Sequence, residues 1–226
     1  MKVAQIEVTL LDCMGSDLSV VNAARVSFDK ESTLETAPSG TGVFYHKLSD
    51  RDAKLIKYLA DHEHKSPFNH CFVSFRVKAP IFVARQLVKH KFLPWNEVSR
   101  RYVDSEPEFF FPEVWRAKAE NVKQGSSDTA VEFTMLDPMS STLCALTDYK
   151  EMLRDGVCPE QARMILPQNT MTEWIWSGSL GAFADMCRLR LDAHAQKESR
   201  DVAEEVAKHL RKLFPVSFEA LVKENK

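Results

Sequence analysis

One stretch of the chain, residues 71–90, changes its hydrophobic period without an intervening loop, and this constrains the fold more than any other feature. Five apolar residues occupy alternate positions at its start: Cys71, Val73, Phe75, Val77 and Ala79. Such alternation is typical of a strand with a buried face. Pro80 suits the first turn of a helix, because its fixed φ is already helical, and Pro94 suits the end of that helix. The sequence therefore predicts a strand that runs directly into a helix over about 81–90.

Most of the remaining chain has the three- and four-residue spacing of amphipathic helices. Ser49 is placed to cap a helix that ends before Pro67. The clearest long pattern predicts a helix over 129–154, with Gly156 positioned to end it. Further helices, the third of them capped by Ser179, are predicted over 20–28, 159–165, 180–191, 201–213 and 218–223.

Strands are few by comparison. Residues 4–11 alternate loosely, and 174–176 is a strand-like run that we expect to end in a turn at Gly178. Residues 31–42 carry the Pro, Gly, Ser and Thr of a mobile loop. No repeat or linker divides the chain. We therefore predict an α+β fold, with one helix-rich domain over residues 1–226 and a small, mostly antiparallel sheet.

Charge and composition exclude several classes of protein. The chain has 30 Lys and Arg against 32 Asp and Glu, so no overall positive field favours nucleic acid or an anionic membrane as partner. No apolar run approaches the length of a membrane helix, and the polar residues 1–7 are not those of a signal peptide, so we expect a cytoplasmic protein. The five cysteines are odd in number and widely spaced, which favours buried free thiols over disulfides or zinc ligands.

The densest group of chemically active side chains lies in residues 85–102. This stretch contains six basic or imidazole side chains and a single carboxylate, that of Glu97. In a net acidic chain, such a cluster favours phosphate or another oxyanion as ligand. The alternative is a solvated basic helix end, which the helix dipole also favours. Gln86, Asn96 and Ser99 add the hydrogen-bond donors and acceptors that a polar heterocycle needs.

Two other polar clusters are less specific. Residues 61–70 contain three histidines, but they have neither the spacing of a zinc finger nor His-Glu-x-x-His, and Pro67 interrupts them, so we predict no metal site. The other cluster is either part of a site or a surface of salt bridges, and it comprises Arg163, Arg188, Arg190, Asp192, His194 and Gln196.

Six segments, taken in order along the chain, resemble those of one enzyme family. The family signature is Arg-His-Arg, seven residues and then Ser. Here Lys89-His90-Lys91 is followed by seven residues and Ser99, so the spacing is intact. The other similar segments are 23–28, 66–70, 78–86, 162–167 and 189–196. Over nearly its whole length the chain is similar to the flavin-dependent thymidylate synthases.

This resemblance implies a methyltransferase enzyme that converts dUMP to dTMP. FAD would be the cofactor, 5,10-methylenetetrahydrofolate the carbon donor and NADPH the reductant, with tetrahydrofolate as the second product. The resemblance also implies a homotetramer whose sites draw residues from several subunits. The expected partners are small molecules, with no nucleic acid and no membrane among them.

The resemblance further assigns site residues. Those that would contact dUMP are Gln86, Leu87, Val88, Lys89, Glu97, Val98, Ser99, Arg100, Arg101, Arg163 and Arg190. Those that would contact FAD are Ser66, Lys89, His90, Lys91, Glu97, Ser179, Leu180, Gly181 and Asp185. His64 is a further candidate contact for the folate or the flavin. Arg190 would be catalytic, because a fixed cation stabilises the uracil when its N3 is deprotonated and so raises the electron density at C5.

The chain departs from the family pattern in two places. Lys89 and Lys91 replace the signature arginines, which keeps the charge but loses the planar fork that binds an anion through two hydrogen bonds. Asp185 stands where the family often has an amide. One alternative is therefore a family member that binds FAD and dUMP without turnover.

A second alternative is a nucleic-acid-binding module. Residues 89–101 would contact phosphates, and Trp95 and Tyr102 would stack on bases. Covalent catalysis is disfavoured, because Ser99 has no base at a recognised spacing. The cysteines also lack the Pro-Cys-His-Gln context of the classical thymidylate synthase.

Overall fold

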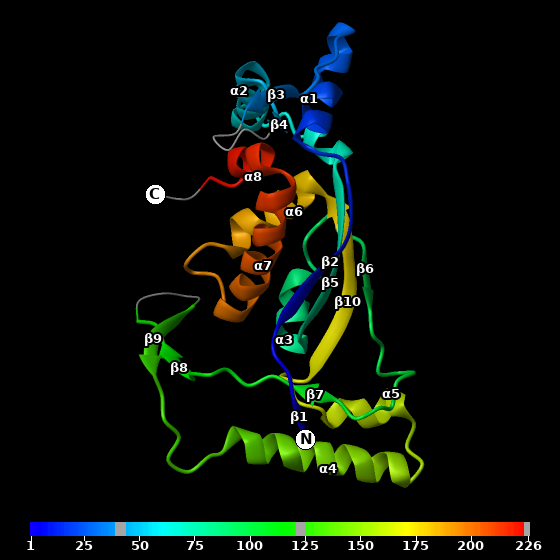
Figure 1. Cartoon of the computed structure of the whole chain (residues 1–226). Helices are drawn as coiled ribbons and strands as arrows, with labels where there is room; N and C mark the ends of the chain where they lie inside the picture. The colour runs from blue at the N-terminus through cyan, green and yellow to red at the C-terminus, as the bar shows by residue number, and fades with distance from the viewer. Residues whose placement is uncertain (39–43, 121–124, 224–226) are drawn as a thin grey trace.

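A four-stranded antiparallel sheet forms the centre of the computed structural model, which describes residues 1–38, 44–120 and 125–223 (Figure 1). Its strand order is β2 (Glu7–Met14), β5 (Phe72–Pro80), β10 (Met171–Ser179) and β6 (Trp95–Glu97). The period-two stretch is β5, and it continues without a loop into α3 (Ile81–Leu87), as the sequence predicts. β2 begins and ends three residues later than the alternation over 4–11 suggests.

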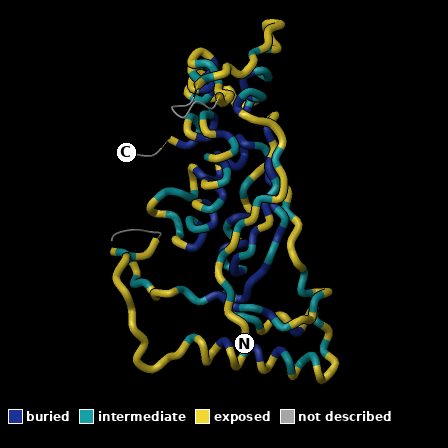
Figure 2. Tube along the Cα trace, viewed as in Figure 1, coloured by how far each residue is buried: buried dark blue, intermediate teal, exposed yellow. Residues whose placement is uncertain are grey.

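Helices cover one face of this sheet. α3, α6 (Leu180–Arg190), α7 (Lys197–Leu213) and α8 (Pro215–Leu221) lie on the same side, where the buried residues gather (Figures 1 and 2). The ring of Phe183 packs edge-on against Phe75 at 5.2 Å and Trp176 at 5.3 Å between ring centroids. Phe183 joins α6 to both central strands in this way. The opposite face of the sheet is half-exposed and carries the Arg76–Glu173 ion pair.

The N-terminal helices close one end of the sheet. α1 (Asp17–Arg25) is followed by a 3₁₀ turn, Val26–Phe28, and α2 (Asp50–Asp61) is capped by the Ser49 hydroxyl as predicted. Between them, β3 (Glu35–Pro38) pairs with β4 (Phe44–Lys47). The expectation of a loop over 31–42 is therefore wrong for 35–38, and 39–42 lie outside the described residues.

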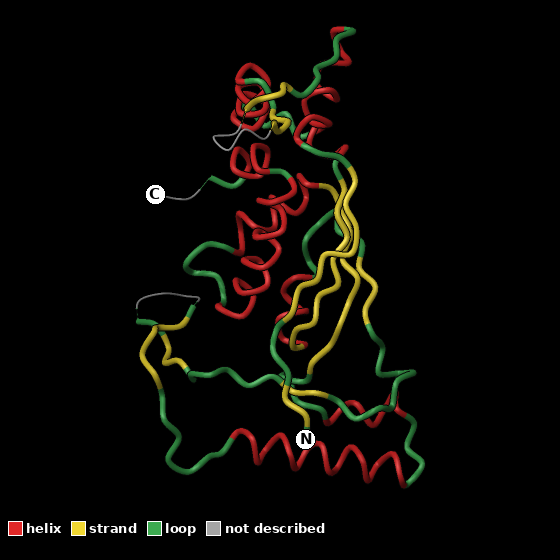
Figure 3. Tube along the Cα trace, in the orientation of Figure 1, coloured by secondary structure: helices red, strands yellow, loops and turns green. Residues whose placement is uncertain are grey.

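A smaller cluster of buried residues closes the other end. β1 (Lys2–Val3) pairs with β7 (Glu108–Phe109), and below them lie α4 (Pro138–Arg154) and α5 (Pro159–Ala162) with a 3₁₀ turn, Arg163–Ile165 (Figure 3). β8 (Arg116–Lys118) and β9 (Ser126–Ala130) form an antiparallel pair, which we call the β8–β9 hairpin. An ion pair between Arg116 and Glu198 joins this hairpin to α7. The hydrophobic cluster at this end is built on the buried residues Phe109, Leu146, Tyr149 and Ala162.

Two boundaries differ from the prediction for local reasons. The long helix begins at Pro138 rather than at 129, because the Asp137 carboxylate accepts hydrogen bonds from the Met139 and Ser140 amides and so caps it there. Gly178 is not a turn but a position inside β10. A Cβ there would lie 2.3 Å from Leu93 Cδ2, so glycine allows the residues that follow α3 to cross the strand closely.

The remaining elements match more closely. Gly156 ends α4 with a φ of +88°, and the Ser179 hydroxyl caps α6 by accepting from the Ala182 amide. α3 is shorter than predicted and stops at Leu87, so Lys89–Lys91 lies in a turn rather than on a helix. The fold is α+β with a small, mostly antiparallel sheet, as predicted.

Candidate active site

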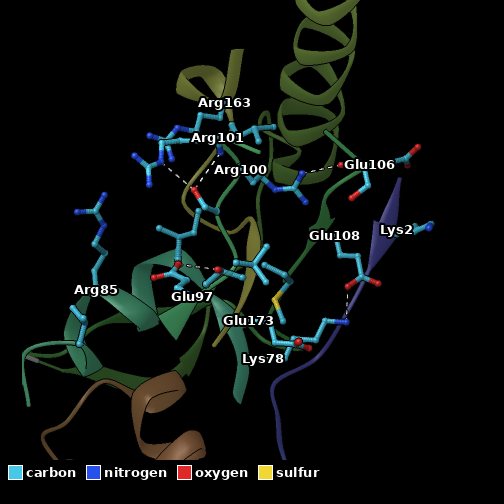
Figure 4. Close-up of a pocket in the computed structure, with 18 residues that line it drawn as sticks. Lys2, Lys78, Arg85, Glu97, Arg100, Arg101, Glu106, Glu108, Arg163 and Glu173 are labelled. Atoms are coloured by element: carbon cyan, nitrogen blue, oxygen red, sulfur yellow. Dashed lines mark hydrogen bonds and ion pairs between the residues drawn. The ribbon is translucent and has the colours of Figure 1, made fainter. Parts of the chain in front are cut away.

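The residues predicted to bind the nucleotide lie in two cavities rather than one. The larger, which we call the α3–β6 cleft, has a volume of 850 Å³ (Figure 4). Seven of the predicted residues line it: Val88, Glu97, Val98, Ser99, Arg100, Arg101 and Arg163. The smaller, which we call the hairpin pocket, has a volume of 630 Å³ and is lined by Gln86, Lys89 and Arg190 from the predicted set.

Glu97 is fixed in the α3–β6 cleft by two protein donors. β6 pairs with β10 so that the Glu97 Oε1 atom accepts from the Thr172 hydroxyl at 2.7 Å. The Oε2 atom accepts from the Trp95 indole N–H at 3.0 Å. The position of the Glu97 carboxylate is therefore set before a ligand binds. Since each carboxylate oxygen has further lone pairs, Glu97 can still accept a hydrogen bond from that ligand.

Arginines occupy the end of the cleft above Glu97 (Figure 4). The Arg101 Nε atom donates to the Ser99 hydroxyl at 3.2 Å, and the Arg163 Nε atom donates to the Glu160 carbonyl at 3.1 Å. Both guanidinium groups keep further donors for an anion. Arg101 is a donor-only group, so it cannot deprotonate Ser99, and Ser99 is suited to binding rather than to nucleophilic attack.

The opposite end of the cleft carries an ion pair. Lys78, from β5, lies 2.5 Å from a carboxylate oxygen of Glu108 in β7. The hydrogen bond to Glu108 raises the pKa of Lys78 above its ordinary value. Lys78 is therefore paired, whereas among the described residues Arg100, Arg101 and Arg163 at the other end take part in no ion pair.

Arg190 is held on two sides at the hairpin pocket. Its Nε atom donates to His90 Nε2 at 3.0 Å, and its Nη2 atom donates to the Gln86 backbone carbonyl at 3.2 Å. Burial, followed by the charge of Arg190, lowers the pKa of His90 to about 4, so the imidazole is neutral and free to accept. Burial also lowers the pKa of Arg190, but a guanidinium stays protonated at neutral pH. The result is an oriented, fixed cation.

A third and much smaller cavity of 30 Å³ lies against the start of α6, and we call it the α6 groove. It is lined by three predicted residues: His64, Gly181 and Asp185. The Asp185 carboxylate is paired with Lys65 at 3.0 Å and with Arg188 at 2.5 Å.

Ser66 and Ser179 lie beside the α6 groove. Ser66 begins the 3₁₀ turn Ser66–His70, and the Ser179 hydroxyl donates to Asn69 Oδ1 at 2.8 Å within that turn. The start of α6 and this turn are therefore held together at the groove.

Some predicted residues do not expose their side chains at these cavities. Leu87 and Leu180 are fully buried in the main core, so only their backbone groups can reach a ligand. Lys91 is exposed and lines none of the three cavities described.

Two arginines at the α3–β6 cleft and the hairpin pocket are absent from the predicted set. Arg85 lines both the α3–β6 cleft and the hairpin pocket. In the helix predicted over 81–90 it would share a face with Lys89, four residues later, and this spacing could have identified it. Arg116, on β8, reaches the hairpin pocket from a distant segment that no local pattern connects to it.

The buried cysteines are unsuited to nucleophilic catalysis. Burial raises the pKa of the Cys71 thiol to about 11, and burial likewise raises the pKa of Cys187. A protonated, buried thiol is a poor nucleophile. Among the described helices, none combines the length and the apolar character that crossing a membrane requires. Within residues 1–38, 44–120 and 125–223, no three His, Cys, Asp or Glu side chains gather in a way that would hold a metal ion.

Comparison with known proteins identifies relatives over nearly the whole chain. The family model described as "Thymidylate synthase complementing protein" matches residues 9–216. A protein of Thermosipho africanus named "Flavin-dependent thymidylate synthase" is 36% identical over 218 residues, which cover 95% of this chain and 90% of that protein. One of the same name from Thermus thermophilus is 38% identical over 219 residues, which cover 94% of this chain and 74% of that protein.

A solved structure has the same fold. It is the crystal structure of a UMP/dUMP methylase, PolB, from Streptomyces cacaoi bound with 5-Br dUMP. The TM-score is 0.80 at 29% sequence identity, and the match covers 97% of this chain and 96% of that one.

Proposed function

We propose a site and a mechanism on one premise, that this chain belongs to the family of flavin-dependent thymidylate synthases. It methylates dUMP to dTMP with a flavin cofactor. 5,10-Methylenetetrahydrofolate supplies the one-carbon unit, and NADPH supplies the electrons that reduce the methylene to a methyl group. Tetrahydrofolate leaves as the second product.

We assign the dUMP site to the α3–β6 cleft and the hairpin pocket together. The observation that carries this assignment is that cationic side chains suited to an anionic nucleotide occupy both cavities, with Arg85 between them. Arg101 and Arg163 offer paired donors to a phosphate or to uracil oxygens, and Ser99 adds a hydroxyl. Gln86 and Lys89 provide the amide and ammonium of the other cavity.

Arg190 is the catalytic residue of this proposal. Its guanidinium, oriented by His90 and by the Gln86 carbonyl, is suited to stabilise the negative charge of uracil when N3 loses its proton. That charge raises the electron density at C5, which then attacks the methylene carbon. The hydrogen bonds are present without a ligand, so the cation needs little reorganisation when the charge develops.

We place FAD at the α6 groove and along residues 89–91. The donor chemistry fits an anionic dinucleotide: Gly181 places the first turn of α6 at the groove, and Lys65 and Arg188, both paired with Asp185, are the cations that line it. Bound there, FAD would supply, in its reduced form, the hydride that completes the methyl group. His64 lines the same groove and is suited to contact the flavin or the folate ring.

We further infer that residues 1–226 act as one domain of a homotetramer in the cytoplasm. Two observations support a homo-oligomer whose binding sites are shared between subunits. The α6 groove, at 30 Å³, is far below the roughly 300–1,000 Å³ of a usual ligand pocket, so FAD needs walls from another subunit. Large apolar side chains are also exposed before and along α4, including Met135, Leu136 and Leu143, as on surfaces that bind a second chain.

The test begins with the visible absorption spectrum of the purified protein, before and after dUMP is added. We expect a flavin spectrum that dUMP perturbs, and release of tritium from dUMP labelled at C5 when folate and NADPH are present. UMP is assayed beside dUMP, because PolB is described as a UMP/dUMP methylase. A perturbed spectrum without tritium release would favour the family member that binds without turnover.

A third outcome would overturn the proposed function. It is a colourless protein that FAD cannot reconstitute, together with nucleic-acid binding that weakens steeply with salt. That result would favour the binding module instead.

A further inference from the structure

We propose that Glu198 and Arg116 are positioning residues of the nucleotide site, which fix the orientation of the Gln86 side-chain amide through Gln196. This inference rests on the proposed function, because it takes the hairpin pocket to be part of the dUMP site. Neither Glu198 nor Arg116 belongs to the residues assigned from the family resemblance.

The first link is a buried ion pair between distant parts of the chain. The Arg116 Nη2 atom on β8 donates to Glu198 Oε1, in the first turn of α7, at 2.7 Å. The Glu198 side chain is only 8% exposed. Arg116 Nε also donates to the Ser126 hydroxyl on β9 at 2.7 Å, so the pair joins both strands of the hairpin to α7.

Glu198 is a fixed acceptor within this arrangement. Burial on its own would raise the pKa of Glu198, but the hydrogen bond and charge of Arg116 outweigh it and hold the pKa below its ordinary value. The group is therefore ionised at neutral pH, when a carboxylate accepts hydrogen bonds and donates none.

The second link transmits this constraint to Gln86. Gln196 Nε2 donates to Glu198 Oε2 at 3.0 Å, which leaves the Gln196 amide oxygen to accept from Gln86 Nε2. Gln86 Oε1 in turn accepts from the hydroxyl of the fully buried Ser199 at 3.2 Å. The three hydrogen bonds therefore form a series in which Ser199 donates to Gln86, Gln86 to Gln196 and Gln196 to Glu198. Neither amide can rotate by 180° without breaking this series.

The direction matters because Gln86 and Gln196 both line the hairpin pocket. With its amide fixed, Gln86 keeps one Nε2 hydrogen and one Oε1 lone pair for a ligand, each in a defined position. A rotated amide would exchange its donor and its acceptor. It would then no longer match the donor and acceptor positions on the edge of a uracil. Arg116, neutralised by Glu198, serves to hold this wall rather than to bind the phosphate.

The test uses the holoenzyme and the dUMP-induced change in the flavin spectrum as a binding assay. In Glu198→Gln an amide replaces the acceptor-only group, so Gln196 and Gln86 can each take either orientation. We expect dUMP binding to weaken about 3- to 10-fold, as for the loss of one hydrogen bond, with KM for dUMP rising by more than kcat falls. Glu219→Gln is the matched control. It likewise removes a carboxylate that is paired with an arginine, because Glu219 in α8 pairs with Arg211 at the end of α7 on a solvent-accessible surface.

Gln196→Met separates positioning from folding. It breaks the chain of hydrogen bonds between Glu198 and Gln86 but leaves the Arg116–Glu198 pair intact, so it carries the test even where Glu198→Gln lowers stability. We expect the same loss of dUMP affinity as in Glu198→Gln. Normal affinity in a folded Gln196→Met protein would overturn the inference.

A double-mutant cycle supplies the decisive readout. Since Glu198 is inferred to act through Gln86, Gln196→Met added to Gln86→Ala should weaken dUMP binding little further. Fully additive losses would show that Gln196 acts elsewhere and would overturn the inference. Failure of the wild-type protein to bind dUMP would instead overturn the proposed function, so the two failures are distinguishable.

Discussion

At the residue scale, the site depends on side chains whose partners fix both their charge and their direction. Arg190 is aligned by a neutral imidazole and a backbone carbonyl, and Glu97 by a hydroxyl and an indole N–H. Lys89 and Lys91, which stand in place of the family's arginines, have no fork geometry to impose such alignment. We therefore assign alignment of the nucleotide to Arg101, Arg163 and Arg190, and general positive charge to the lysines.

Arg190→Ala should abolish most turnover while the protein remains folded. Loss of a fixed charge that stabilises the transition state costs about 3 kcal/mol, so we expect kcat to fall about 10²- to 10³-fold. Steady-state formation of dTMP measures it. Arg211→Ala, which removes a half-exposed arginine paired with Glu219 at the end of α7, is the control and should change kcat by no more than a few-fold. Near-normal kcat in Arg190→Ala would contradict the catalytic role.

His90 should make the protein sensitive to acid in a defined pH range. Its pKa in the folded state is about 4, against an ordinary value of 6.5. Between these values the unfolded chain binds a proton that the folded chain does not, so stability falls as pH is lowered through this range and is unaffected by His90 above it. Relative to His90→Gln, the wild-type free energy of unfolding should therefore decrease from about pH 7 to about pH 4. Urea denaturation across this range measures the difference, and parallel curves would exclude the effect.

At the scale of elements, the sequence pattern correctly predicted those strands, caps and helix ends that are determined by neighbouring residues. The alternation of β5, the cap at Ser49 and the glycine after α4 are set by neighbouring residues, so they could be predicted from the sequence. Gly178 in β10 depends on Leu93, which approaches from a distant part of the chain, so no local pattern contains that contact. The strand at 35–38 pairs with the neighbouring β4, and the turn residues of 31–42 concealed it.

The site divides in the same way. Residues in contiguous motifs, such as Glu97–Arg101, could be identified from the sequence together with the family resemblance. Arg116 could not, because its place in the site depends on how the β8–β9 hairpin packs against α7. Tertiary contacts of this kind are visible only in the folded chain.

The contact between α1 and α8 gives a prediction at this scale. The Asp17 carboxylate, 7% exposed, accepts hydrogen bonds from the Val216 and Ser217 amides at 2.9 Å each and so caps α8. Asp17→Ala leaves both amides without this acceptor, and we expect a loss of about 1–2 kcal/mol in the free energy of unfolding. Asp148→Ala, at an exposed position inside α4, is the control. A change below about 0.5 kcal/mol in urea denaturation would argue against the cap.

At the scale of the whole molecule, one chain carries two partial sites. Ser99, Arg101 and Arg163 line the α3–β6 cleft, whereas Gln86, Lys89 and Arg190 line the hairpin pocket. A single dUMP must meet Arg190 with its uracil and the cleft arginines with its phosphate, and we have proposed that each site is shared between subunits. We therefore expect dUMP to join the cleft of one subunit to the hairpin pocket of another, although Arg85 lines both cavities of its own chain. A closed, symmetric homo-oligomer makes every such bridge equivalent.

Complementation between two inactive variants tests this arrangement. Arg163→Ala should damage only the cleft and Arg190→Ala only the hairpin pocket, so each variant, as the homotetramer that we propose, lacks one half of every site. In a randomly mixed tetramer, about a quarter of the sites pair an intact cleft with an intact pocket, and dTMP formation should return toward that fraction of the wild-type rate. Co-expression followed by purification with two different tags gives the mixed species. If both arginines served one site within a single chain, every site would contain a damaged chain and the mixture would stay inactive.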